Sequence, residues 1–310
     1  MIVVVAANPA LDVTYAVDAL KPGTSHRVRT VTQRAGGKGV NVARVLSGLG
    51  HSTVVVGLAG GVTGHQLRAE LDAEHLRHRF VPLVGETRRT VTVVAGGDAT
   101  VFNEPGPVVD GVAWDALVEG VARALGGGAT GLVCSGSLPP GAPAGSYAAL
   151  VRLARDQRIP VVVDAEGMPL LAAARAGADL VKPNAAELAA TTGVASHIQA
   201  AQVLRGAGAG SVAVSLGADG MLAVTGQGAW RVRLPRRLAG NPTGAGDAAA
   251  AAFVAGMASG QAWVDMLRHA VALSAAAVLA PVAGSVDVVA YHGLLPDVHV
   301  EEIDAAHPDR

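Results

Sequence analysis

The chain has 310 residues, half of them hydrophobic, and 24 Lys and Arg against 25 Asp and Glu give a formal net charge of -1. This length can bury one large core or two modest ones. A near-neutral charge with no cluster of Lys and Arg in the sequence argues against the basic surface that nucleic acid or an anionic membrane requires. We therefore expect a globular enzyme with no nucleic-acid or membrane partner, in which any anionic ligand is held locally.

The compartment is predicted from three weaker signals. Within residues 1–12, a proline and an aspartate interrupt the apolar run too early for a signal peptide, and a basic flank is missing. The single cysteine, Cys134, fits a reducing compartment because it has no internal disulfide partner. The longest apolar helix candidate, residues 244–258, contains Asp247 and does not meet the hydropathy of a membrane span. These signals favour the cytoplasm.

Short, largely apolar runs recur along the chain, at residues 2–7, 53–58, 131–134, 160–163, 179–181 and 211–216. Buried parallel strands have this pattern. The stretches between them carry apolar residues at helical spacing, as at Val40, Ala43 and Leu46. Alternating strands and helices predict an α/β fold with a mainly parallel central sheet between two helical layers.

Two segments break this alternation, at about residues 11–34 and 87–104, where apolar and polar residues interchange. Within the second segment, Gly97-Asp98 is a hairpin-turn signal. We expect antiparallel strands that stand off the main sheet as a small β-sheet lid. The lid strands are then insertions in a single domain that spans residues 1–310.

The last third of the chain is predicted to be helical over residues 244–259 and 262–280, before a polar tail from Val298 that we expect to fray. The first of these helices opens with Gly244-Ala245-Gly246-Asp247. Two glycines allow close backbone approach to a ligand, and the N–H groups of a helix start form an anion site. A carboxylate there suits phosphoryl transfer, although an Asp at this point is also an ordinary helix cap.

A second glycine-rich turn, Ala35-Gly36-Gly37-Lys38-Gly39-Val40-Asn41, opens another predicted helix. It is not a P-loop, because Gly39 follows Lys38 where a magnesium-binding hydroxyl would stand. From this segment alone, a plain strand-to-helix turn with a solvated lysine is equally compatible. No G-x-G-x-x-G follows the first strand, which argues against a nicotinamide-dependent dehydrogenase.

From Asn8 to Gly284 the chain resembles the ribokinase-like, PfkB-type carbohydrate kinases. The motifs that carry the resemblance occur in the family's order: Asn8-Pro9-Ala10-Leu11-Asp12, Gly36-Gly37-Lys38-Gly39-x-Asn41, Thr87-Arg88, Ser135-Gly136-Ser137-Leu138-Pro139-Pro140-Gly141, Val163-Asp164, Val181-Lys182-Pro183-Asn184-x-x-Glu187, Val214-Ser215-Leu216-Gly217-x-x-Gly220 and Gly244-Ala245-Gly246-Asp247. The resemblance implies a ribokinase-like three-layer α/β/α sandwich with a β lid, and an ATP-dependent kinase that uses Mg²⁺.

The resemblance also implies a catalytic loop and a sugar site. Asp247 is the expected base, while the backbone N–H groups of Gly244, Ala245, Gly246 and Asp247 itself hold the phosphoryl oxygens. The residues implied to contact the sugar are Asp12, Gly37 and Asn41, and Lys38 would reach either the sugar's phosphate or the transferring group. Read without the family, Asp12 caps a turn.

Arg88, on the predicted lid, is implied to bind, together with Lys38, the phosphate that the sugar already carries, because its planar fork suits a phosphate dianion. By strand alternation Arg89 faces away from the site. The alternative is a solvent-facing arginine on an edge strand. The family often has Asn at the position of Thr90, so one sugar contact departs from its pattern. Ser137, in a turn that ends a strand, completes the substrate set.

On the nucleotide side the implied residues are Lys182, Ser215, Gly217 and Gly220, with adenine between this last turn and residues 276–284. The family uses the equivalents of Asn184 and Glu187 to organise Mg²⁺ through water, as this ion readily retains its waters. An N-cap Asn followed by a Glu in the first turn is also an ordinary helix start.

These residues lead us to expect transfer of the γ-phosphate of Mg-ATP to a hydroxyl of a ketohexose monophosphate. The acceptor is tagatose 6-phosphate or fructose 1-phosphate, and the product is the 1,6-bisphosphate; Asn241-Pro242 and Gly85-Glu86-Thr87-Arg88 favour the tagatose 6-phosphate kinases. The alternatives are a 6-phosphofructokinase, a kinase of an unphosphorylated sugar and a catalytically silent sugar-phosphate sensor. Beyond sugar phosphate and ATP, the expected partner is a second copy bound through the lid.

Overall fold

The main sheet forms the centre of the molecule. The computed structural model describes residues 1–96, 98–143 and 145–304. The strands of the main sheet are β1 (Ile2–Ala6), β4 (Thr53–Gly60), β5 (His78–Leu83), β8 (Gly131–Ser135), β9 (Val161–Asp164), β10 (Leu180–Val181), β11 (Ser211–Ser215), β12 (Met221–Val224), β13 (Ala229–Arg233) and β14 (His299–Ile303). Their order across the sheet is β14-β13-β12-β11-β10-β9-β8-β1-β4-β5. Every pair from β11 to β5 is parallel, which confirms the predicted parallel centre.

Helices cover both faces of this sheet. One face packs against α3 (Gly111–Gly126), α4 (Ser146–Asp156), α5 (Gly167–Arg175), α6 (Ala185–Thr192) and α7 (His197–Ala207). The other packs against α1 (Lys38–Gly48), α2 (Gly61–Ala73), α8 (Ala245–Ala258), α9 (Trp263–Val278) and α10 (Val288–Leu294). Strand β1 shows why both cores form, because Val3 and Val5 enter one and Ile2 and Val4 the other. The three-layer α/β/α prediction is confirmed.

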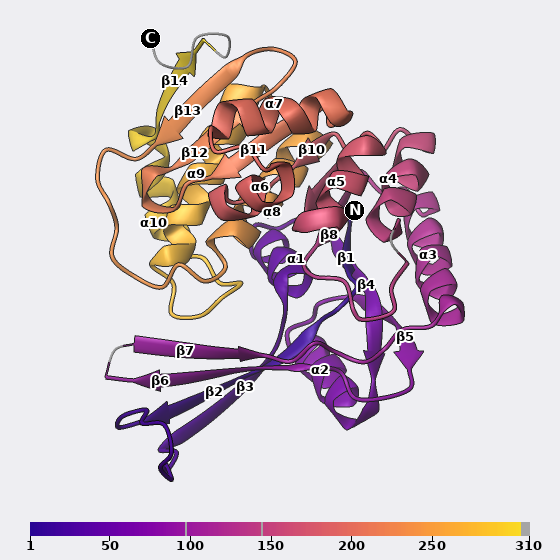
Figure 1. Cartoon of the computed structure of the whole chain (residues 1–310), viewed down its shortest axis with the longest axis vertical. Helices are drawn as coiled ribbons and strands as arrows, with labels where there is room; N and C mark the ends of the chain where they lie inside the picture. The colour runs from indigo at the N-terminus through magenta and orange to yellow at the C-terminus, as the bar shows by residue number, and fades with distance from the viewer. Residues whose placement is uncertain (97, 144, 305–310) are drawn as a thin grey trace.

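A second sheet, the lid, projects away from the main sheet at the lower left of Figure 1. Its strands are β2 (Ala10–Val17), β3 (Thr30–Gly36), β6 (Arg89–Ala95) and β7 (Asp98–Asn103), in the order β3-β2-β6-β7. The expectation of purely antiparallel strands was wrong for β2 and β6, which pair in parallel. Both strands enter the lid after parallel strands of the main sheet, β1 and β5, so they leave it in the same direction. Gly97 of the predicted hairpin turn lies outside the described residues.

The edge of the main sheet differs from the prediction. Strands β12, β13 and β14 continue it in antiparallel fashion, and β14 pairs with β13 along His299–Ile303. The expectation that the chain frays from Val298 was therefore wrong up to Ile303, and residues 305–310 lie outside the described part. The polar composition of β14 follows from its position, because an edge strand has one neighbour and keeps much of its side-chain surface in water.

Helix α8 is buried between α1, α9 and the sheet. Its small side chains permit this close packing, since Ala248, Ala249, Ala250 and Ala251 have no exposed surface and neither do Phe253 and Val254. Each fully buried residue as large as Val or Phe contributes about 1.5–3 kcal/mol. Although α8 is apolar, no helix in the described ranges combines the length and hydropathy needed to cross a bilayer. The packing fixes the position of the N-terminus of α8.

Candidate active site

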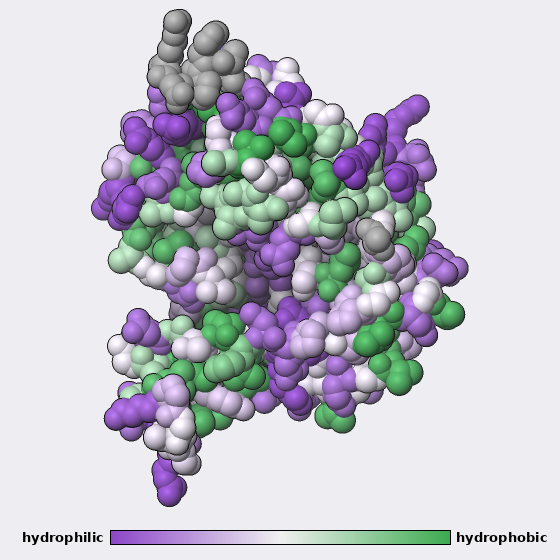
Figure 2. All heavy atoms as spheres, viewed as in Figure 1, coloured by the Kyte–Doolittle hydropathy of each residue, from purple (hydrophilic) through white to green (hydrophobic). Residues whose placement is uncertain are grey.

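A cleft of about 900 Å³ lies between the main body and the lid, at the carboxyl ends of the parallel strands. Figure 2 shows the molecule hollowed between these two parts, with hydrophilic side chains inside the hollow. The predicted site residues that line the cleft are Asp12, Gly37, Lys38, Asn41, Arg88, Ser137, Lys182, Asn184, Glu187, Ser215, Gly244, Gly246 and Asp247. Ala245, Gly217 and Gly220 instead line an adjoining pocket of about 460 Å³, which shares Ser215 with the cleft.

The catalytic loop predicted at the start of α8 has the geometry of an anion site. The N-cap is Gly244, whose φ of 89° lies in the left-handed region that favours glycine, and Asp247 is the third residue of the helix. Asp247 is therefore not the helix cap. The N–H groups of Gly246 and Asp247 have no partner inside the helix, whereas that of Ala245 donates to the carbonyl oxygen of Pro242 at 3.2 Å. The helix dipole adds to the attraction for anions.

The Asp247 carboxylate is buried, with 5% of the residue exposed. Asn41 Nδ2 donates to Asp247 Oδ2 at 2.9 Å. Burial and the nearby Asp164 raise the pKa of Asp247 to about 6, against the opposing effects of Asn41, Lys38 and Lys182. A carboxyl group with this pKa is mostly ionised at neutral pH and is still a stronger base than an ordinary aspartate.

Two lysines converge on a buried carboxylate beside this loop. Lys38 Nζ lies 3.6 Å from Asp164 Oδ1 and 3.6 Å from Glu187 Oε1, and Lys182 Nζ lies 3.4 Å from Asp164 Oδ2. Burial lowers the pKa of Lys38, but Asp164 and Glu187 outweigh it and the pKa is raised overall. A Cβ at Gly246 would lie 3.3 Å from Lys182 Nζ, so this ammonium group sits at the anion site. Lys38 is thus paired with two carboxylates at the end of the cleft that contains Asp247.

The start of α6 forms a complete capping box. Glu187 N donates to Asn184 Oδ1 and Asn184 N donates to Glu187 Oε2, both at 2.8 Å. The ordinary helix-start interpretation of this pair is therefore correct as local structure. Glu187 Oε1 remains directed at Lys38. Within the described ranges, His, Cys, Asp and Glu side chains nowhere gather in a group of three or more that could hold a metal ion.

Arg88 lies at the lid end of the cleft, immediately before β6. Its Nε donates to the carbonyl oxygen of Asn8 at 3.1 Å and its Nη1 to Thr90 Oγ1 at 3.4 Å. Its neighbour Arg89 is exposed, as strand alternation predicts. Burial raises the pKa of Asp12, and a hydrogen bond with Thr90 and the charge of Arg88 partly offset this effect. Arg88 and Asp12 therefore act on one another electrostatically within the cleft.

Two residues at the lid end of the cleft were not predicted as site residues from the sequence. Asn8 joins it to the main body, because its Nδ2 donates to Ser137 Oγ at 3.3 Å while its carbonyl oxygen accepts from Arg88. Thr90 occupies the position where the family often has Asn, and it contacts both Asp12 and Arg88. Asn8 could have been found from its position directly after the first apolar strand, where ligand-binding residues of α/β proteins lie.

The adjoining pocket is lined largely by apolar side chains. It lies between the turn that carries Gly217 and Gly220 and the end of α9 at Val278. Leu234, Leu238 and Val271 supply further apolar surface. An apolar slot that opens into a charged cleft suits a flat ring attached to a phosphate chain.

Comparison with known proteins identifies the family of this site. Phosphofructokinase-2 from Escherichia coli, solved in complex with potassium, is 30% identical over 95% of this chain and 98% of that chain, with a TM-score of 0.89. The same enzyme in complex with fructose-6-phosphate gives a TM-score of 0.86, at the same identity and coverage. A Thermotoga maritima protein described as a possible 1-phosphofructokinase is 26% identical over 98% of this chain and 100% of that chain, with a TM-score of 0.88.

The family model of the pfkB family carbohydrate kinases matches residues 1–288. This range includes the lid, the anion site of α8 and the lysine cluster. The match and the similarity to two phosphofructokinases agree with the motif order in the sequence. The chain therefore belongs to the pfkB family of carbohydrate kinases, as a phosphofructokinase-like sugar kinase.

Proposed function

We propose that this chain is an ATP-dependent phosphohexose kinase that phosphorylates a ketohexose monophosphate to the 1,6-bisphosphate. The observation that carries the proposal is the position of Arg88, whose guanidinium lines the same cleft as Asp247. Two of its nitrogens are held by Asn8 and Thr90, whereas Nη2 makes no hydrogen bond within the described part of the chain. A fixed guanidinium with a free edge suits the phosphate of a sugar substrate.

The residues at the other end of the cleft support the transfer step. The ionised Asp247 accepts the proton of the acceptor hydroxyl, whose oxygen attacks the γ-phosphorus of ATP as the bond to the ADP oxygen breaks. The N–H groups of Gly246 and Asp247 donate to the phosphoryl oxygens. Lys182, and Lys38 with its raised pKa, add positive charge where negative charge is redistributed. We therefore assign Lys38 to the transferring group and leave the sugar's own phosphate to Arg88.

The charge of the cleft supports a cation requirement. The acidic side chains that line it are Asp12, Glu104, Asp164, Glu166, Glu187 and Asp247, against Lys38, Arg88 and Lys182. This excess of carboxylates repels a polyphosphate unless a divalent cation accompanies it. Asn184 and Glu187 are the residues that would hold hydrated Mg²⁺, which when bound neutralises charge on the phosphates. The apolar slot between Gly217 and Val278 would take the adenine ring.

Two ketohexose phosphates are our preferred acceptors, and the solved relatives add a third candidate. We favour tagatose 6-phosphate or fructose 1-phosphate as acceptor, and between these two Asn241-Pro242 and Gly85-Glu86-Thr87-Arg88 favour tagatose 6-phosphate. Fructose 6-phosphate is the second candidate, because the Escherichia coli relative was solved with it. A silent sensor is disfavoured, because the buried base and its anion site are both present.

A substrate panel tests the proposal. The protein is incubated with ATP, Mg²⁺ and, in turn, tagatose 6-phosphate, fructose 1-phosphate, fructose 6-phosphate and the free sugars, and ADP is measured. We expect kcat/KM to be highest for tagatose 6-phosphate or fructose 1-phosphate. Turnover of free sugars alone would remove the phosphate role of Arg88, and binding without any turnover would indicate the sensor.

The lid is also our candidate for a dimer interface. Its exposed apolar side chains include Val31, Val101 and Phe102, which are 55%, 50% and 54% exposed. Val31 lies on β3 and the other two on β7, the two edge strands of the lid, and exposed apolar side chains on open sheet edges favour association. The Escherichia coli relative has a tetrameric inhibited form, so a relative of this chain self-associates.

A further inference from the structure

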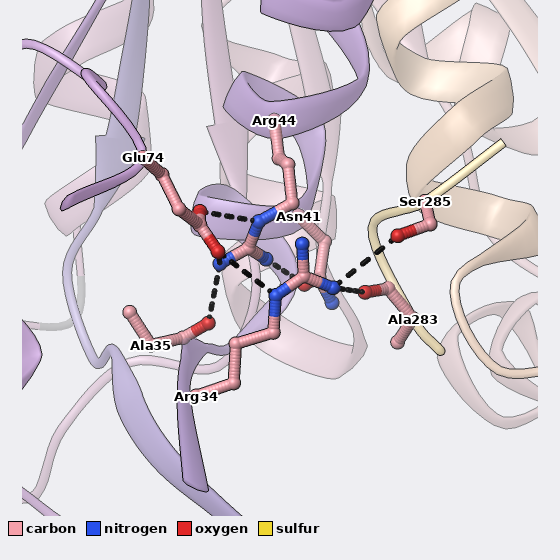
Figure 3. Close-up of polar contacts among 7 residues, drawn as sticks. All are labelled: Arg34, Ala35, Asn41, Arg44, Glu74, Ala283 and Ser285. Carbon is pink, nitrogen blue, oxygen red and sulfur yellow. Dashed lines mark hydrogen bonds and ion pairs between the residues drawn. The ribbon is translucent and has the colours of Figure 1, made fainter. Parts of the chain in front are cut away.

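Behind the catalytic loop, two arginines share one carboxylate. Arg44 Nε donates to Glu74 Oε2 at 2.7 Å, and Arg34 Nε donates to Glu74 Oε1 at 3.0 Å. Figure 3 shows both guanidinium groups directed at the Glu74 carboxylate. The Arg44 side chain is only 9% exposed, while Arg34 and Glu74 are 30% and 26% exposed. Glu74 and Arg34 are therefore partly solvated, and Arg44 is the member that reaches into the protein.

Arg44 also contacts the residue that holds the proposed base. Its Nη1 donates to Asn41 Oδ1 at 3.2 Å, and its Nη2 donates to the carbonyl oxygen of Ala35 at 2.8 Å. The opposite end of the same amide, Asn41 Nδ2, donates to Asp247. Rotating the amide by 180° would place its oxygen against the carboxylate and its NH₂ group against the guanidinium. Only one amide orientation therefore satisfies both neighbours.

The residues around Asn41 leave little room for another arrangement. Gly284 packs onto it, since a Cβ at this glycine would lie 2.7 Å from Asn41 Oδ1 and 3.0 Å from Arg44 Nη1. Arg34 holds the same segment by donating to the carbonyl oxygen of Ala283 at 3.2 Å and to Ser285 Oγ at 3.3 Å. The Arg44 contact is thus enclosed by α1, the end of α2, β3 and residues 283–285.

We propose that Arg44, held by Glu74, is a positioning residue that fixes the Asn41 amide with its NH₂ group toward Asp247. Arg44 does not line the cleft and acts through Asn41. The inference rests on Asp247 being the base of the proposed function. Its consequence is that the proton affinity of the base depends on an arginine on the opposite side of Asn41.

Other charged groups face the same residues and must stay unchanged in a test. Asp247 is surrounded by Asp164 at the end of β9, by Lys38 at the start of α1 and by Lys182 after β10. Arg44 is faced by Glu74, by Arg34 and by Asp12 of β2. Asp12 belongs to the sugar site, so losing Arg44 also affects sugar binding. The pKa of Asp247 must therefore be measured without sugar.

The test compares three variants of the full chain. Arg44→Met removes the contact with Asn41, and Arg44→Lys keeps the positive charge but cannot reproduce the planar set of donors. Arg34→Met is the matched control, because it removes the other ion pair of Glu74 and the contacts to Ala283 and Ser285 while Arg44 keeps its hydrogen bond to Asn41. The pKa of Asp247 is measured by ¹³C NMR of protein labelled at the aspartate carboxyl carbons and assigned with Asp247→Asn. Thermal unfolding checks that each variant is folded.

We expect the pKa of Asp247 to rise in both Arg44 variants and to stay at its original value in Arg34→Met, because the hydrogen bond from Asn41 favours the ionised carboxylate. In a turnover assay, kcat at neutral pH should fall by about ten- to hundredfold in Arg44→Met, which is the loss expected when a reacting group is slightly misplaced. An unchanged pKa in folded Arg44→Met or Arg44→Lys, or an equal rise in Arg34→Met, would overturn the proposal. The NMR measurement needs no turnover. A failure of the Arg44 proposal can therefore be told apart from a failure of the proposed function.

Discussion

The two ends of the cleft are built in different ways. At the base end, Asp247, Asn41 and Lys182 are only 5%, 6% and 3% exposed. Asp247 and Asn41 lie on α8 and α1, and Lys182 directly follows β10. At the lid end, Arg88 is half-buried and directly precedes β6 of the lid. The edge strand of the lid, β7, is exposed along its whole length. The chemistry is thus fixed by core packing, whereas the group proposed to recognise the substrate stands on a separate, thinly packed element.

This contrast has a functional meaning. A base held by the core can serve any hydroxyl that reaches it, because its geometry does not depend on the sugar. A phosphate-binding arginine outside the core can be replaced with little effect on the fold. Changes at the base end should therefore lower kcat for every acceptor, and changes at the lid end should discriminate between acceptors.

The largest expected effect is that of Asp247→Asn, which keeps the shape of the side chain and removes the base. We expect kcat to fall by about 10²–10⁴-fold for all sugar phosphates, the range typical of a lost general base. ATP binding, measured by calorimetry, should persist because the N–H groups of the loop remain. Near-normal turnover in this variant would show that the proton goes elsewhere.

At the lid end, Arg88→Met should raise KM for the phosphorylated sugar by about ten- to hundredfold, as expected for loss of a charge-assisted hydrogen bond. The fold should be unaffected and kcat should change little. Arg89→Met is the matched control, because this neighbouring arginine is exposed and does not line the cleft. Equal effects of the two variants on steady-state KM would mean that general electrostatics, and not Arg88, binds the phosphate.

The pH dependence of kcat/KM examines the base end without a mutation. With a pKa of about 6 for Asp247, the active, ionised form predominates above pH 6 and is lost below it. The rate should therefore fall about tenfold per pH unit below pH 5. The sugar phosphate ionises in the same range, so the residual rate of Asp247→Asn serves as the control. If the decrease in kcat/KM at low pH persists in that variant, it is not caused by protonation of Asp247.

The smallest expected effect concerns the outer face of the lid. Phe102→Lys should weaken self-association by about fivefold or more, as for other buried aromatic contacts at interfaces. Val112→Lys on α3 is the control, since Val112 is also exposed, at 79%, but lies away from the lid. Sedimentation equilibrium measures both. If both variants associate like the original chain, the lid is not the interface.

The sequence predicted the parts of the fold that depend on local pattern. Apolar runs such as residues 53–58 and 131–134 became parallel strands of the main sheet, because strands buried on both faces need no polar positions. The pattern failed at β14, where an edge strand carries the polar composition of a loop. It also failed for the direction of β2 against β6, which depends on where each strand leaves the main sheet.

The site residues that belong to a sequence motif could be predicted. The contacts between residues that only folding brings together could not. Gly244-Ala245-Gly246-Asp247 and Gly36-Gly37-Lys38-Gly39 are recognisable from neighbouring residues alone. The hydrogen bond between Asn41 and Asp247 joins residues 206 positions apart, so no local pattern records it. The same holds for Arg44 and Glu74, which are 30 positions apart and carry no motif of their own.

The capping box of α6 gives Glu187 a structural role that is separate from its proposed role at the cation. The structural task of Glu187 is to accept a hydrogen bond from the backbone N–H of Asn184 through Oε2, and a glutamine performs the same task. A single Glu187→Gln change would therefore remove a charge next to Lys38 while the helix start stays intact. If Glu187 organises a hydrated cation as proposed, descendants of this chain can change that role at position 187 while the start of α6 keeps its stability.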